Sequence, residues 1–392
     1  MATCDTRDAV RWLIDGARTA QLPEDVLQQL CERMVACGVP LAGASVFVQT
    51  LHPGLFGRCF LWRRGLGVLI IEFPYESEEC IALQRSVEAG IRASDKVLTL
   101  EPDREDSCLN IAKFRNLRAK DITQFVATPL VFSDGEVHLA IWSTRQSGGL
   151  TEEQTRGIER IVAPLARVAE VFALRRRAAV LLDTYVGRTS GTRILAGQIR
   201  RGQTEAIKAA IWLSDMRGFT ELADRIPPQA LIELLNRYFD CQVPAILRRG
   251  GEVLKFMGDG MLAVFPITEN DGGVKHVCNA ALAAAYEARA EIAALERAGD
   301  GAPVRFGLAL HVGTVMYGNI GGANRLDFTC IGPAVNLAAR VEKLTGRLGR
   351  SILASAAFAS ACDEPMVSVG EFELAGFEQP ETVFGLSDEI GG

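Results

Sequence analysis

The first part of the chain passes from a helical to an extended pattern of hydrophobic positions. Between residues 8 and 37, apolar side chains recur three or four positions apart, which predicts helices. From Ala44 to Phe73, apolar residues form short runs separated by Gly and Pro, and such runs predict strands. Two further strands are predicted at 125–132 and 137–144, joined by a turn at Ser133-Asp134-Gly135. A sheet combined with helices is therefore expected here.

A long helix is predicted to follow. Thr151 is suited to cap its start, and the acids Glu152 and Glu153 favour its first turn. The helical pattern continues past Val171 into LRRRAAVLL. Its apolar positions admit two interpretations, which are a helix packed on its own domain and a parallel dimer helix that links two domains. Residues 187–202 are rich in Gly, Ser, Thr and Arg and are expected to mark a boundary.

The second half of the chain alternates strands and helices. A strand is predicted from about Ala206 to Ser214, a helix from Pro227-Pro228 to about Arg249, and a hairpin around Gly258-Asp259-Gly260. There follow a long Ala-rich helix, the strand VRFGLALHVG, a Gly-rich GNIGG segment, the short strand DFTCI and a helix from Pro333 to Leu344. This order predicts an α+β domain with a ferredoxin-like palm, an antiparallel sheet with helices on one face.

Composition places the chain among ordinary globular proteins. Of 392 residues, 48% are hydrophobic and 23% are charged, which excludes a largely disordered chain. At roughly 150 residues per domain, two or three domains are expected. The net charge of −6 argues against a nucleic-acid partner, because phosphate contacts require a basic surface.

Cysteine usage and the N-terminus bear on the compartment. Ten cysteines are scattered without a CxxC pair, and only four histidines occur, which argues against a Cys/His zinc site. Unpaired thiols suit a reducing compartment. The N-terminus lacks a signal-peptide pattern, and the apolar run from Leu66 to Phe73 is too short to span a bilayer. A cytoplasmic protein without membrane insertion is therefore expected.

Two acidic residues stand at the ends of predicted neighbouring strands. Asp215 follows the strand IKAAIWLS, and Asp259 lies in the hairpin tip between two glycines. Carboxylates at adjacent strand ends can converge on divalent cations, and Mg²⁺ prefers carboxylates together with substrate phosphates. A Gly-Asp-Gly triplet alone is a common turn, but together these residues predict a metal site suited to phosphoryl transfer.

The segments SDMRGFT, KFMGDGMLAVF and GNIGGANRLDFTCIGPAVNLAARVE occur in an order and spacing that resembles the catalytic domain of class III nucleotidyl cyclases, over roughly residues 205–388. The resemblance implies an adenylate cyclase that converts ATP to 3',5'-cyclic AMP and pyrophosphate with two Mg²⁺ or Mn²⁺ ions per active site. It also implies a homodimer, because in this family the metal ligands of one site come from one subunit and the base-reading residues, Asn and Arg from the other. The alternatives are a guanylate cyclase and a catalytically weak nucleotide-binding regulatory protein on the same fold.

The resemblance also assigns individual roles. The matching positions are the metal ligands Asp215, Asp259 and the carbonyl of Met216, the base-reading residues Lys255 and Thr329, the ribose-orienting Asn336 and the transition-state residue Arg340. Lys255 can donate to N1 of adenine and Thr329 can accept from its N6 amine, so ATP is favoured over GTP. Cys330 is expected on the opposite face of the strand. Thr329, in place of the Asp of animal enzymes, resembles a bacterial subclass.

One position departs from the family pattern. Where the family often has a lysine that grips the triphosphate, this chain has Ala375 before Gly376. Arg325 is the candidate to supply the missing positive charge. If no other cation serves, the affinity for phosphate is expected to be reduced.

Residues 40–172 resemble, more weakly, a GAF-like sensor domain. The predicted organisation is thus a GAF-like α/β regulatory domain with N-terminal helices over 1–172, a helical linker over 173–204 and the cyclase domain over 205–392. The resemblance allows an unidentified small ligand in the first domain, whose chemistry the sequence leaves open. His52 is interpreted as structural rather than as a haem or metal ligand, and Trp62 and Trp142 are interpreted as core residues.

Overall fold

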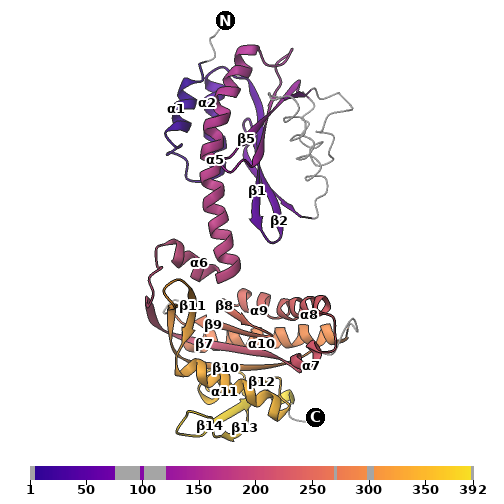
Figure 1. The fold of residues 1–392 in the computed structure, drawn as a ribbon, viewed down its shortest axis with the longest axis vertical. Helices are drawn as coiled ribbons and strands as arrows, with labels where there is room; N and C mark the ends of the chain where they lie inside the picture. Colours follow the sequence, from indigo (N-terminus) through magenta and orange to yellow (C-terminus); the bar gives the residue numbers. More distant parts are fainter. Residues whose placement is uncertain (1–4, 76–97, 101–120, 269–271, 298–303, 390–392) are drawn as a thin grey trace. The chain divides into compact units, whose positions relative to one another are not determined.

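Two units, each with a sheet and helices of its own, make up the chain (Figure 1). The computed structural model describes residues 5–75, 98–100, 121–268, 272–297 and 304–389. The first unit is Met1–Leu181 and the second is Leu182–Gly392. The boundary falls within the long helix α5 (Glu152–Val186).

The first unit contains a six-stranded antiparallel sheet in the order β3-β2-β1-β6-β5-β4. Its strands are β1 (Leu41–His52), β2 (Leu55–Arg63), β3 (Gly67–Pro74), β4 (Leu98–Leu100), β5 (Gln124–Val131) and β6 (Val137–Thr144). The strands predicted here are confirmed. At the predicted turn, the N–H of Phe132 donates to the carbonyl of Glu136, and Gly135 has a φ of +86°.

Helices α1 (Arg7–Ile14), α2 (Pro23–Ala36) and the first part of α5 share one core with this sheet. Trp62 and Trp142 are buried in that core, as predicted. Thr151 caps α5, because its hydroxyl accepts a hydrogen bond from the N–H of Gln154 at 3.3 Å. His52 accepts a hydrogen bond from the N–H of Gly54, which supports a structural role in the β1–β2 turn. The assignment of a GAF-like domain stays a prediction.

The second unit contains an eight-stranded sheet in the order β13-β14-β12-β10-β7-β9-β8, with β11 paired to β10. Its strands are β7 (Thr204–Arg217), β8 (Glu252–Met257), β9 (Gly260–Pro266), β10 (Arg305–Gly321), β11 (Leu326–Ile331), β12 (Ile352–Ser355), β13 (Val367–Phe372) and β14 (Glu381–Gly385). The neighbouring strands within β10-β7-β9-β8 all pair antiparallel, and the predicted hairpin is confirmed. The sheet as a whole is mixed, because β12 pairs parallel to β10, so the expectation of a purely antiparallel sheet was wrong. The assignment of a ferredoxin-like palm stays a prediction.

Helices of the second unit cover both faces of this sheet, which corrects the expectation of helices on one face. They are α6 (Arg188–Leu195), α7 (Phe219–Ala223), α8 (Pro228–Asp240), α9 (Val243–Arg248), α10 (Gly273–Arg297), α11 (Pro333–Leu348), α12 (Ala356–Ala359) and the 3-10 turn Ser387–Glu389. Successive residues of a strand point to opposite faces. Ala210 and Trp212 therefore pack with α8, α9 and α10, whereas Ala209 and Ile211 pack with α6 and α11.

One further expectation about this unit was wrong. The helix predicted from Pro227-Pro228 to Arg249 is two helices, because Pro244 lacks the N–H that a continuous helix would need. The side chain of Gln242, at the break, is buried and accepts a hydrogen bond from Ser214 at 2.7 Å. The GNIGG segment continues strand β10, and a Cβ at Gly318 would overlap the backbone of the neighbouring Gln203.

The predicted linker over 173–204 consists of the end of α5 and helix α6, and α6 is tied to the sheet by a buried carboxylate. Glu252 of β8 accepts hydrogen bonds from the backbone N–H and the hydroxyl of Ser190 at 3.0 and 2.7 Å, and from the hydroxyl of Tyr317 at 2.7 Å. All three residues are buried. Among the described residues, no helix is both long and apolar enough to cross a membrane.

Candidate active site

The carboxylates of Asp215 and Asp259 lie together at one edge of the second unit's sheet. Asp215 is near the end of β7, and Asp259 occupies the two-residue turn between β8 and β9. Antiparallel pairing of Ser214 with Met261 brings the hairpin tip beside the end of β7. A Cβ placed on Gly260 would lie only 3.1 Å from Oδ1 of Asp215, so the hairpin tip approaches this carboxylate closely. The sequence prediction that these two residues converge is thus supported by the backbone register.

The electrostatics of this pair reflect its crowding. The pKa of Asp215 is raised from 3.8 to about 7, first by burial, then by the negative charges of Asp259 and Glu342 and by a hydrogen bond with Asp259. The backbone N–H of Met216 acts in the opposite direction by donating to the carboxylate. Two carboxylates held this close repel one another unless a proton or a cation lies between them.

Glu342 of α11 was missed by the sequence analysis. Its charge acts on Asp215, and in turn the charge of Asp259 acts on Glu342, so all three carboxyl groups face one region. Burial raises the pKa of Glu342, whereas the positive charge of Arg217 lowers it. The sequence held one signal, because Glu342 lies four residues after the buried Ala338 and three before the buried Thr345, on the apolar face of its helix.

The donor set at this edge fits a hard divalent cation. No group of three or more His, Cys, Asp or Glu side chains within the described ranges has the geometry of a complete metal site. Magnesium characteristically binds through one or two carboxylates and takes its other oxygens from water and substrate phosphates. Asp215 and Asp259 supply those carboxylates. The role predicted for the carbonyl of Met216 stays a prediction, since the contact seen at this residue is made by its N–H.

Lys255 and Thr329, the predicted base-reading residues, come from β8 and β11. Thr329 is buried, and its hydroxyl has no hydrogen-bond partner among the described residues. Cys330 packs in the core with Tyr317 and Phe328, on the other face of the strand, as alternation predicts. The pKa of Cys330 is raised to about 11 by burial, and the positive charge of Lys255 acts against this rise.

Asn336 and Arg340 lie four residues apart on α11, so they share one side of the helix. Asn336 is exposed. Nε of Arg340 donates a hydrogen bond of 3.2 Å to the carbonyl of Ala375, the position where the family often has lysine. A guanidinium therefore lies beside the turn in which the sequence lacks a positive charge.

Arg325, the predicted substitute for that lysine, lies elsewhere. It is exposed in the turn between β10 and β11, where its carbonyl accepts a hydrogen bond from the N–H of Gly322. Gly307 of β10 pairs with Asp215, and the strand runs to Gly321 before this turn. At about 3.3 Å per residue, roughly 46 Å of strand separates the turn of Arg325 from the aspartate edge of its own chain.

Comparison with known proteins gives a consistent family. Residues 203–385 match the model of the adenylate and guanylate cyclase catalytic domain. The chain is 32% identical to an adenylate cyclase of Anabaena cylindrica over 158 residues, which are 40% of this chain and 31% of that protein. It is 31% identical to adenylate cyclase 1 of Rhizobium meliloti over 183 residues, which are 45% of this chain and 27% of that protein. The match thus spans about a third of the length of these relatives.

Among solved structures, the adenylyl cyclase CyaB from P. aeruginosa is 30% identical, with a TM-score of 0.42, and the match covers 46% of this chain and 94% of that one. The guanylyl cyclase Cya2 is 25% identical, with a TM-score of 0.41, over 48% of this chain and 97% of that one. The family model matches the part of the chain that carries Asp215 and Asp259. Residues 203–385 therefore belong to the catalytic domains of the class III nucleotidyl cyclases.

Proposed function

We propose that this protein is an adenylate cyclase, which converts ATP to 3',5'-cyclic AMP and pyrophosphate in a homodimer. The observation that carries the proposal is the pair Asp215 and Asp259, at the strand end and hairpin tip of a domain from this family. In the reaction, the ribose 3'-oxygen forms a bond to the α-phosphorus, the bond from that phosphorus to the bridging oxygen breaks, and pyrophosphate leaves. The 3'-hydroxyl loses its proton in the same process.

The chain's own residues have distinct tasks in this chemistry. Asp215 and Asp259 hold Mg²⁺ or Mn²⁺, two ions per site, and such cations lower the pKa of a hydroxyl and neutralise phosphate charge when bound. Arg340 offers a planar guanidinium to the charge that develops on the phosphoryl oxygens. Asn336 carries an exposed amide that can orient the ribose by hydrogen bonding.

The choice of ATP rests on Lys255 and Thr329. An ammonium can donate to N1 of adenine, which is an acceptor, but meets a donor at N1 of guanine. The hydroxyl of Thr329 is buried and finds no hydrogen-bond partner in the described part of the chain, and a buried polar group without a hydrogen bond costs about 1–3 kcal/mol. A base amine would relieve that cost. These features favour adenine.

The rotation of α11 supports a site shared between two copies. Glu342 faces the carboxylates of its own chain. At about 100° per residue, Arg340 points roughly 160° away from Glu342 around the helix axis. Arg340 therefore faces away from the aspartates of its own chain and is available to those of a second copy. Two equivalent sites would form between paired domains.

Exposed apolar residues on α5 also favour a dimer. Val171, Leu174, Leu181 and Tyr185 are all exposed, and with Ala178 they repeat at alternating intervals of three and four residues. This repeat is typical of the seam of a two-stranded coiled coil. Leu165 and Val168, by contrast, are buried in the core of the first unit. The first part of α5 thus packs on its own unit, and we propose that the later part forms the dimer helix.

One assay tests the proposal. The purified chain is incubated with Mn²⁺ or Mg²⁺ and with ATP or GTP, and the cyclic products are separated and quantified. We expect cyclic AMP to exceed cyclic GMP, and Asp215→Asn to abolish both while the circular dichroism spectrum stays unchanged. Lys255→Glu combined with Thr329→Cys is expected to shift the preference toward GTP. Predominant cyclic GMP formation by the natural chain would identify a guanylate cyclase, and the absence of any cyclic product would refute the proposal.

A further inference from the structure

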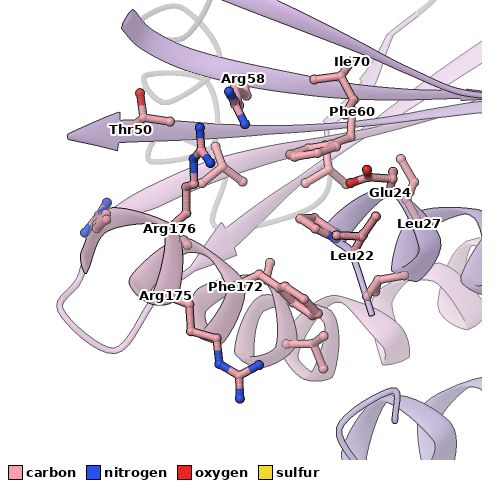
Figure 2. A pocket seen from close by; sticks show the side chains of 18 of the residues that line it. Leu22, Glu24, Leu27, Thr50, Arg58, Phe60, Ile70, Phe172, Arg175 and Arg176 are labelled. Carbon is pink, nitrogen blue, oxygen red and sulfur yellow. The ribbon is translucent and has the colours of Figure 1, made fainter. Parts of the chain in front are cut away.

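A cavity of about 380 Å³ lies in the first unit, between the sheet and helices α2 and α5 (Figure 2). This volume is within the range of pockets that hold small organic ligands, roughly 300–1,000 Å³. Its walls are mainly apolar, and Leu27, Phe60 and Phe172 reach it from three different elements. Apolar walls on several sides require a ligand whose body is itself apolar.

One end of this cavity is positively charged. Figure 2 shows the guanidinium groups of Arg58 and Arg176 turned toward one another, with Thr50 nearby. Arg58 pairs with Glu72, which compensates one of the two charges. Arg176 has no ion pair with any carboxylate of the described residues. Two converging cations with one anion leave a net positive charge where an anionic ligand group would be stabilised.

The remaining charges orient a ligand. Arg177 also lines the cavity, but it is paired with Asp134 and Glu136. The carboxylate of Glu24 lies away from the two converging arginines, near Leu27 and Phe60 (Figure 2). An anionic group is therefore favoured at the arginine end, and an uncharged apolar body in the rest of the cavity.

We propose that this cavity binds an organic monoanion with an apolar body and a single carboxylate-like group, held by Arg176 and Arg58. The site is independent of the nucleotide site, since all of its residues belong to the first unit. Phe172 and Arg176 lie on one side of α5, and about 100° per residue places Leu174 of the exposed seam roughly 160° from Phe172. The bound ligand thus contacts α5 on the side opposite that seam.

Isothermal titration of the full chain tests this site. Two probe anions distinguish the kinds of body: 2-naphthylacetate, which is flat and aromatic, and decanoate, which is a flexible chain. Neutral 2-naphthylethanol and decan-1-ol are the matched controls for charge, and acetate is the control for the body. We expect at least one probe anion to bind one-to-one and more tightly than its neutral analogue and than acetate.

The decisive variants are Arg176→Gln and its neighbour Arg175→Gln. Arg175 also lines the cavity, but Figure 2 shows it pointing away from Arg58, so it serves as a control for a charge on the same helix turn that does not belong to the arginine pair. Loss of a charge-assisted hydrogen bond is expected to weaken binding of the anion by about tenfold or more in Arg176→Gln. Arg175→Gln is expected to leave the Kd unchanged. Equal effects of the two variants, equal binding of the neutral analogues, or no saturable binding of either anion would overturn the proposal.

Discussion

The division of each active site between two chains can be tested with two inactive variants. Asp215→Asn removes a carboxylate of the metal pair, and Arg340→Ala removes the guanidinium that faces away from that pair. Either variant alone is expected to lose about 100-fold or more in turnover, the usual effect of removing one charge-stabilising group. A mixed dimer contains one site with both defects and one with neither. When equal amounts of the two variants pair at random, half of the dimers are mixed. Because one of the two sites in each mixed dimer is intact, the whole mixture is expected to have about a quarter of the natural rate.

The assay is cyclic AMP formation by co-expressed variants that carry different affinity tags. Purification through both tags isolates the mixed dimer, which should have about half the natural rate because one of its two sites is intact. The matched control combines Asp215→Asn with Asp259→Asn. Both changes affect the metal pair, so each site of this dimer keeps a defect and no rate returns. If the Asp215→Asn and Arg340→Ala dimer were no faster than this control, the metal pair and the arginine of one site would have to come from the same chain.

Three other predictions concern the metal pair and the linker. Because the pKa of Asp215 is about 7 in the folded chain, Mn²⁺ affinity should fall about tenfold per pH unit below pH 7 and level off above it, which titration calorimetry at several pH values measures. For the same reason the metal-free protein should lose stability as the pH rises from about 4 to 7, which thermal unfolding at several pH values measures. A Mn²⁺ affinity and a stability that do not change with pH would contradict the raised pKa. Gly260→Ala should lower turnover about tenfold while the fold is kept, because the added Cβ would lie 3.1 Å from Oδ1 of Asp215 and displace this carboxylate. An unchanged rate and an unchanged Mn²⁺ affinity would show that the close approach of the hairpin tip to Asp215 is not needed. Glu252→Gln should destabilise the second unit by about 3 kcal/mol in urea unfolding, because one of the groups that donate to Glu252 would then face the N–H of an amide. The control Glu205→Gln, at an exposed ion pair, should change the free energy of unfolding little. Equal losses of stability in the two variants would show that the buried hydrogen bonds of Glu252 do not stabilise the unit.

Local patterns along the chain were a sound guide to the elements. The hairpin around Asp259 and the capped start of α5 at Thr151 depend on residues close in sequence, so turn and capping preferences were enough to predict them. One error arose where a single residue outweighed a pattern, because Pro244 divides the helix predicted up to Arg249. The glycines of GNIGG allow close backbone approach within strand β10.

In the candidate site, too, local patterns predicted some features and not others. Asp215 and Asp259 could be brought together from the sequence, because each ends a strand and adjacent strand ends share an edge. The proximity of Glu342, and the hydrogen bond between Arg340 and Ala375, could not be inferred in this way. Both depend on how α11 is rotated against the sheet. That rotation is set by packing of the whole apolar face of the helix.

Periodicity, turn residues and motif spacing in the chain were thus sufficient for the strands and helices, the paired aspartates and the family of the second unit, because each depends on short-range geometry. The cover of helices on both faces of the sheet, the burial of Thr329 and the charged end of the cavity beside Arg176 emerged only from the folded structure. These features join residues that are distant in sequence. Their contacts are selected by the packing of entire faces, and no local pattern records which faces meet.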